Sequence, residues 1–227
     1  VLLFVALHAR SLLMVVKFCG INKREYAEMA VELGADFVGF LVGITHLAED
    51  KLTNEQARSI ISATDFRSST PIAVTHLQNA DEIVKTMREI GVSAVQIHDS
   101  ITPEGINVIR DAFPQGYIIK AVHVDSMERS LEKALLFEEY ADAIILDSRT
   151  SERLGGTGVT HDWNISREIV KQLKKPVFLA GGLTPENLAA AIDFVHPYGV
   201  DVNSGVEIGG EKDYDKMKRF IEIAKGK

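Results

Sequence analysis

The chain of 227 residues is 46% hydrophobic and 25% charged, and it contains one cysteine. This composition excludes a disordered polymer, and a single cysteine excludes an internal disulfide framework. The net charge of −7 at pH 7 argues against nucleic acid as a partner, because binding to a phosphate backbone depends on clustered Lys and Arg.

Residues 1–13 form a short apolar run, interrupted by His8 and Arg10, in front of Met14. The run lacks a basic leading segment and a small-residue cleavage site, and it is shorter than the roughly 20 residues of a membrane span. We therefore expect no membrane association, and we treat residues 1–13 as a non-native or disordered extension of one domain over 14–227. The alternative is a genuine segment packed against the bottom of that domain.

Beyond Met14, short runs rich in Val, Ile and Phe alternate with longer stretches of helical periodicity. Such alternation is typical of βαβ units around a parallel sheet. The predicted strands are 15–19, 36–42, 71–75, 94–97, 117–122, 143–146, 177–179 and 200–202. Helices are predicted between them, including 23–33, 53–62, 80–90 and 184–194, the last with Thr184 as its N-cap.

Eight β/α units in a chain of this length predict an α/β fold of the (β/α)8 TIM-barrel type, as a single domain. A doubly wound sheet is the alternative. In a barrel, chemistry lies where the strands end and lead into the following helices. The residues just after each predicted strand are therefore the candidate site residues.

The last two predicted strands end in small residues, Gly181-Gly182 and Ser204-Gly205. Turns at these two strands, each leading into a helix start, are the usual phosphate site of barrels, since glycine lets backbone amides approach a dianion. Gly156, in a glycine-rich run after the sixth strand, is a third candidate donor. The alternative is that all of these are ordinary turn residues.

Cys19 and Asp147 end the first and sixth predicted strands. A substrate held by its phosphate at the last two strands would lie between them, and a thiol facing a carboxyl group across a sugar suits acid/base isomerisation. The pair needs tuned acidities, so we expect burial to raise the pKa of Asp147 and nearby positive charge to lower that of Cys19. The alternatives are a small core cysteine and an aspartate that only forms a turn.

Several segments, taken together and in order, resemble the phosphoribosylanthranilate isomerase family: 17–21, 34–40, 95–98, 146–148, 155–158, 162–163, 180–187 and 200–207. The resemblance implies a cytoplasmic, cofactor-free aldose-ketose isomerase of tryptophan biosynthesis, a monomer or homodimer that acts on a phosphorylated aminosugar. It implies an Amadori rearrangement in which Asp147 is the general acid that opens the furanose ring and Cys19 is the general base that removes the C2′ proton.

The loop after the second strand departs from the family. Family members usually carry a basic residue there, commonly Arg, which meets the anthranilate carboxylate, but residues 40–57 contain no Arg. Lys51 is the only Lys there, and Glu49 and Asp50 precede it. Lys51 is therefore a candidate substrate-binding residue.

Four histidines, His46, His76, His98 and His123, end or follow the second to fifth predicted strands. We expect them to bind the substrate, including its carboxylate, or to hydrogen-bond the loops. Alternatively, their imidazoles and Asp147 hold a divalent metal in a related phosphosugar epimerase, isomerase or aldolase. A non-catalytic barrel that binds a phosphate ligand is a further alternative, because fold does not fix function.

Overall fold

The computed structural model describes residues 14–45, 48–148 and 161–226. The predictions for residues 1–13, His46 and Gly156 lie outside these ranges. No helix in the described ranges is long and apolar enough to cross a membrane.

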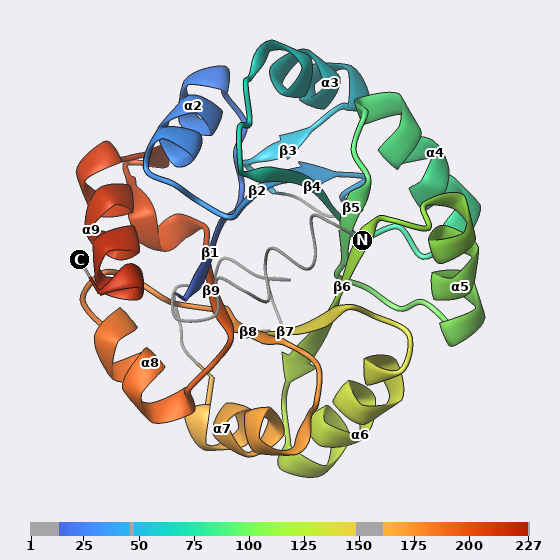
Figure 1. Ribbon diagram of the computed structural model, residues 1–227, viewed down its shortest axis with the longest axis vertical. Coiled ribbons are helices and arrows are strands. Elements are labelled where there is room, and N and C mark those ends of the chain that lie inside the picture. The colour runs from blue at the N-terminus through green and yellow to red at the C-terminus, as the bar shows by residue number, and fades with distance from the viewer. Residues whose placement is uncertain (1–13, 46–47, 149–160, 227) are drawn as a thin grey trace.

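The fold is a closed barrel of parallel strands, seen end-on in Figure 1. β1 pairs with β2 on one side and with β9 on the other, which closes the ring and excludes the doubly wound alternative. The barrel strands are β1 (Val15–Phe18), β2 (Phe37–Val42), β4 (Thr70–Thr75), β5 (Ala94–Ile97), β6 (Tyr117–Val124), β7 (Ala143–Ser148), β8 (Val177–Leu179) and β9 (Gly199–Val202). The predicted TIM barrel is confirmed.

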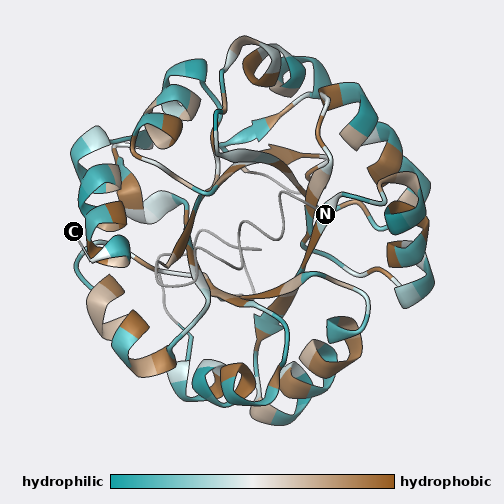
Figure 2. Cartoon of the chain, viewed as in Figure 1, coloured by the Kyte–Doolittle hydropathy of each residue, from teal (hydrophilic) through white to brown (hydrophobic). Residues whose placement is uncertain are grey.

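An outer ring of helices covers the barrel (Figure 1). They are α2 (Arg24–Glu32), α3 (Asn54–Ala63), α4 (Ala80–Ile90), α5 (Pro103–Ala112), α6 (Met127–Glu138), α7 (Trp163–Gln172), α8 (Leu188–Val195) and α9 (Tyr214–Lys225). Most of them turn an apolar face to the strands and a polar face outward, whereas α8 is apolar over most of its surface, as the colouring of Figure 2 shows.

The element boundaries agree with the predicted ones to within two residues except at α8. The predicted helix begins at Thr184, whereas α8 begins after Asn187. The reason is a local turn, in which Asn187 Oδ1 accepts a hydrogen bond from the Thr184 amide at 2.8 Å and Thr184 Oγ1 accepts one from the Glu186 amide at 3.2 Å. Three short strands were not predicted: β3 (Lys51–Leu52) at the edge of β2, and the antiparallel pair β10 (Glu207–Ile208) and β11 (Glu211–Lys212).

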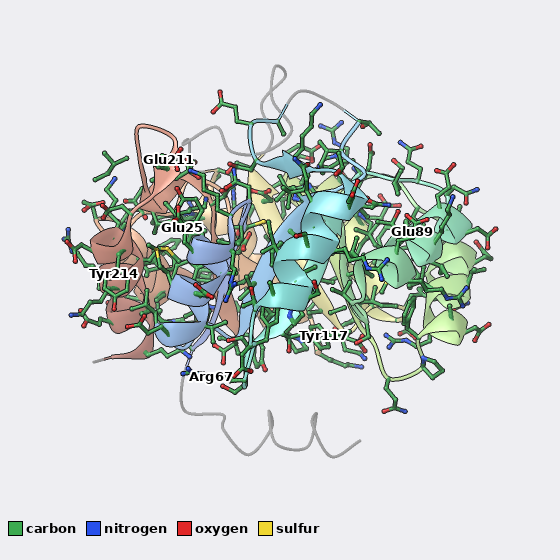
Figure 3. All side chains as sticks on the ribbon, turned by 90° about the horizontal axis from the view of Figure 1, so that it is seen from above. Glu25, Arg67, Glu89, Tyr117, Glu211 and Tyr214 are labelled. Carbon is green, nitrogen blue, oxygen red and sulfur yellow. The ribbon has the colours of Figure 1, made fainter. Side chains whose placement is uncertain are left out.

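The interior of the barrel changes from apolar to polar along its axis. A buried cluster that includes Val15, Phe37, Ile145 and Phe178 fills the lower part. Alternate residues of a strand face the same side. The residues two and four positions after each of these strand residues therefore also face the barrel interior, nearer the carboxyl ends of the strands. Figure 3 shows the axis from the side, with Tyr117, the first residue of β6, at the lower end and Glu211 at the upper end.

Candidate active site

The inward-facing positions at the carboxyl ends bring the two predicted catalytic residues to one rim. Cys19 follows β1, two positions beyond the inward-facing Lys17, and its amide donates a 2.8 Å hydrogen bond to the Val202 carbonyl of β9. Asp147 lies near the end of β7, two positions beyond the inward-facing Ile145. Both side chains are buried and both face the mouth of the barrel.

A buried ion pair lies directly beneath Cys19. Lys17 and Asp201 are register partners on β1 and β9, and Lys17 Nζ donates to Asp201 Oδ1 at 2.7 Å with no part of the Lys17 residue exposed. The charge of the ammonium also favours the thiolate form of Cys19. Gly39 on β2 leaves room for this arrangement, because a Cβ there would stand 3.2 Å from both Cys19 Sγ and Lys17 Nζ.

Sequence reasoning missed this Lys17–Asp201 pair. A signal was present, because Lys17 stands two residues before Cys19 and therefore shares its face of β1. Its partner could not be read from the sequence, since Asp201 is 184 positions away and becomes a neighbour only when β9 closes the barrel against β1.

Two groups contact the carboxylate of Asp147. Its Oδ1 accepts a 2.7 Å hydrogen bond from the Ser148 amide, and its Oδ2 lies 3.3 Å from Nε2 of His98, which follows β5. Burial alone would raise the pKa of Asp147, but the hydrogen bond and charge of His98, with the charge of His123 and the Ser148 amide, outweigh it and lower the pKa.

The acidities that we expected from the sequence are therefore wrong. Burial raises the pKa of Cys19 to about 11, against an opposing effect from Lys17. The charge of Lys17 is already balanced by Asp201, so the ammonium cannot overcome the cost of burying a thiolate. The surroundings of the two side chains thus favour a neutral Cys19 thiol and an ionised Asp147.

Three of the predicted histidines form a row across adjacent strands, which we call the imidazole row: His76 after β4, His98 after β5 and His123 on β6. The rings of His76 and His98 stack at a centroid distance of 4.9 Å and an interplanar angle of 20°, and those of His98 and His123 lie 5.2 Å apart at 50°. The exposed fractions of His76 and His98 are 4% and 7%.

The metal alternative finds no ligand set in the part of the chain that the structure describes. No group of three or more His, Cys, Asp or Glu side chains in those ranges could hold a metal ion. The near-parallel stack of His76 and His98 explains this, because rings that lie face to face do not direct their nitrogens toward one point.

The predicted phosphate-binding residues that the structure describes lie together after β8 and β9. Gly181 and Gly182 both have positive φ, +81° and +67°, and Ser204 begins a short 3-10 helix, η1 (Ser204–Val206). The glycines also have a packing role, since a Cβ on Gly181 would lie 2.0 Å from Ser148 Oγ and one on Gly205 would lie 1.8 Å from the Leu183 carbonyl oxygen. The two turns thus pack against each other and against the end of β7.

Lys51 is exposed on β3. Its neighbour Asp50 contacts residues that follow the barrel strands. Asp50 Oδ2 accepts a 3.1 Å hydrogen bond from Asn203 Nδ2, and its Oδ1 accepts a longer one of 3.4 Å from Asn22 Nδ2. Burial raises the pKa of Asp50, and the nearby Lys212 opposes this rise. This side of the rim therefore presents a carboxylate where we expected an ammonium group.

Known proteins match this chain over nearly its whole length. The N-(5'-phosphoribosyl)anthranilate isomerase 2 of Methanosarcina mazei is 42% identical over 215 residues, which cover 93% of this chain and 94% of that protein. The crystal structure of the phosphoribosyl anthranilate isomerase from Thermotoga maritima is 36% identical with a TM-score of 0.80, covering 94% and 99% of the two chains. A phosphoribosyl anthranilate isomerase in complex with reduced 1-(o-carboxyphenylamino)-1-deoxyribulose 5-phosphate is 34% identical with a TM-score of 0.77, again covering 94% and 99%.

A thiol and a carboxyl group at the carboxyl end of a (β/α)8 barrel, beside paired glycine turns, are the features of an acid/base enzyme for a phosphorylated sugar. A family model described as N-(5'phosphoribosyl)anthranilate (PRA) isomerase matches residues 16–223. The chain belongs to this family and is an aldose-ketose isomerase.

Proposed function

We propose that the chain isomerises N-(5'-phosphoribosyl)anthranilate to 1-(o-carboxyphenylamino)-1-deoxyribulose 5-phosphate in tryptophan biosynthesis. The observation that carries this proposal is the order of strands in the ring, in which β1 and β7 flank the adjacent strands β9 and β8. A sugar whose phosphate is bound at β8 and β9 extends between Cys19 on one side and Asp147 on the other. The relative that was crystallised with the reduced product analogue has the same fold over 94% of this chain.

The phosphate would be bound by the turns after β8 and β9. The amides of Gly181 and Gly182 are available for this role because both residues turn the backbone through positive φ. Ser204 and Gly205 add the first turn of η1, whose position after the last barrel strand is typical of phosphate sites in this fold.

Two proton transfers complete the reaction. The Asp147 carboxyl group gives its proton to the ring oxygen, the C1′–O bond breaks, and a protonated Schiff base forms. The Cys19 thiolate then takes the C2′ proton, and the C2′–H electron pair forms the enolamine, which tautomerises to the ketose. Each positioned acid or base of this kind contributes about 10²- to 10⁴-fold to the rate.

The reacting state therefore needs a proton on Asp147 and none on Cys19, which is the reverse of the forms that the surroundings of these side chains favour. Substrate binding favours protonation of Asp147, because a dianionic phosphate and the exclusion of water both raise its pKa. The same two effects oppose the Cys19 thiolate, so the thiolate depends on the charge of Lys17, which lowers the pKa of Cys19.

The test is turnover of N-(5'-phosphoribosyl)anthranilate, followed by the loss of anthranilate fluorescence, together with rescue of a tryptophan-requiring strain that lacks this isomerase. We expect Cys19→Ser and Asp147→Asn to lower kcat by about 10²-fold or more. Bound ligand must still protect both variants against thermal unfolding, which shows that they fold. Full activity in either variant, or no turnover by the unmodified protein, would refute the proposal.

A further inference from the structure

The imidazole row lies across the barrel mouth from the phosphate turns. The ring runs β1, β9, β8, β7, β6, β5, β4 and β2 before it closes on β1. In a ring of eight, the strand four steps from β8 is β4, and the strand four steps from β9 is β5. His76 follows β4 and His98 follows β5, so the row begins directly opposite the phosphate turns.

A substrate of the proposed function has a phosphate at one end and an aromatic carboxylate at the other. With the phosphate at β8 and β9 and the sugar between Cys19 and Asp147, the aromatic end points toward β4, β5 and β6. That end carries a negative charge, and burying it requires hydrogen-bond donors, preferably cationic ones.

The buried ammonium groups at this rim are already held by carboxylates. Lys17 is paired with Asp201, and Lys212 contacts Glu207 and the side chain of Asn203. These groups lie on or next to β1, β9, β10 and β11, close to the phosphate end and far around the ring from β4. Donors for a carboxylate at the opposite end must come from β4 to β6, where the imidazole row lies.

Within the row, the middle and outer histidines have different roles. His98 Nε2 is engaged with Asp147, whereas its Nδ1 is buried and has no hydrogen-bond partner among the described residues. His76 stacks against one side of His98, and His123, the register partner of Asp147, packs against the other. His123 thus lies beside the acid residue, and His76 lies at the far end of the row from it.

We propose that His76 and His123 form the subsite for the aromatic carboxylate, in which imidazole donors replace the guanidinium or ammonium group that usually binds such an anion. This inference rests on the proposed function and specifies how the enzyme selects its substrate. His76 and His123 bind the carboxylate in both substrate and product, so they act on affinity more than on the chemical step.

The experiment compares two ligands by calorimetry: reduced 1-(o-carboxyphenylamino)-1-deoxyribulose 5-phosphate and its phenyl analogue without the carboxylate. A charge-assisted hydrogen bond contributes enough for the unmodified protein to prefer the carboxylate by about 10- to 100-fold. We expect His76→Leu, His123→Leu and the double variant to lose most of this preference while binding the phenyl analogue as before. His76→Asn, which keeps a donor, should recover part of it.

The matched control is His196→Asn, since His196 is exposed at the end of α8 with a φ of +54° that Asn also tolerates. The control should leave both affinities unchanged. In steady-state assays, the double variant should raise KM by about 10-fold or more with a smaller change in kcat. A double variant that binds the phenyl analogue normally and keeps the full carboxylate preference would overturn the inference. An unmodified protein that does not turn over the substrate would instead refute the proposed function.

Discussion

The acidity of Cys19 gives the sharpest test of how the site is built. Burial raises the pKa of its thiol from the ordinary 9.0 to about 11, a change of two pH units. Each unit corresponds to about 1.4 kcal/mol, so the folded protein disfavours the thiolate by about 3 kcal/mol. At pH 10 about a tenth of the thiol should be ionised, whereas about nine tenths of an ordinary thiol would be.

Substitution of Lys17 by Met tests the cause of this acidity. Lys17 is the main group that lowers the pKa of Cys19 against the effect of burial. Removal of a cation in contact with an ionisable group shifts its pKa by about one unit or more, so the thiolate fraction at pH 10 should fall to about a hundredth. Met is apolar and similar in length.

The assay is the ultraviolet absorbance of the thiolate, with the Cys19→Ser variant subtracted to remove the signal from tyrosine. The chain contains a single cysteine, so the difference spectrum reports Cys19 alone. Lys120→Met is the matched control, because Lys120 is also buried but occupies the opposite face of β6 from His123. Circular dichroism at pH 10 confirms that each protein is folded. A midpoint near 9 in the unmodified protein, or an unchanged midpoint in Lys17→Met, would refute the reasoning.

Three further predictions concern packing and charge. Gly181→Ala should lower the free energy of unfolding by about 1–3 kcal/mol more than Gly210→Ala, measured by urea denaturation, because both have positive φ but only Gly181 has neighbours in the way of a Cβ. His98→Gln should raise the pKa of Asp147, as followed by carbon NMR of the labelled carboxyl group, since it removes the main charge that opposes burial. Lys120→Met should stabilise the protein at pH 7, because burial lowers the pKa of Lys120 to about 8 and the folded protein therefore disfavours its charged form. This advantage should disappear as the pH rises from 8 to 10.5, since the unfolded chain binds one more proton than the folded protein over that range. Equal unfolding free energies for the two glycine variants, a lower Asp147 pKa, or a pH-independent effect at Lys120 would contradict the respective arguments.

The sequence was sufficient to predict the barrel because its strands are buried on both faces. Strand β7 (Ala143–Ser148) is buried throughout, and a parallel strand of this kind appears in the sequence as a continuous apolar run. The three short strands were not predicted because each has only two residues, too few to show the alternation of apolar and polar residues that indicates a strand. β3 pairs only with the end of β2, and β10 pairs with β11 across a tight turn, so tertiary contacts rather than propensity define them.

The sequence predicted which residues lie at the site, but it did not predict the protonation states of Cys19 and Asp147. Strand ends indicate which side chains face the rim, so Cys19, Asp147 and His98 were identified from order alone. The pKa of Cys19 depends on whether the charge of Lys17 is free or balanced, and that depends on Asp201 on the last strand. The pKa of Asp147 depends similarly on the hydrogen bond from His98, which lies on a strand that is not adjacent to β7. Acidity therefore depends on contacts that form only when the barrel closes.

The preferred protonation of Cys19 and Asp147 has a consequence for the proposed reaction. Once Asp147 has given its proton to the ring oxygen and Cys19 has taken the C2′ proton, the site again contains a carboxylate and a neutral thiol, the forms that the surroundings of these side chains favour. Both proton transfers therefore lead to the preferred forms, so the site assists the removal of the C2′ proton and this step is not the slow one. With deuterium at C2′, the expected result is little or no primary isotope effect on kcat. A large effect would instead place the slow step at proton abstraction.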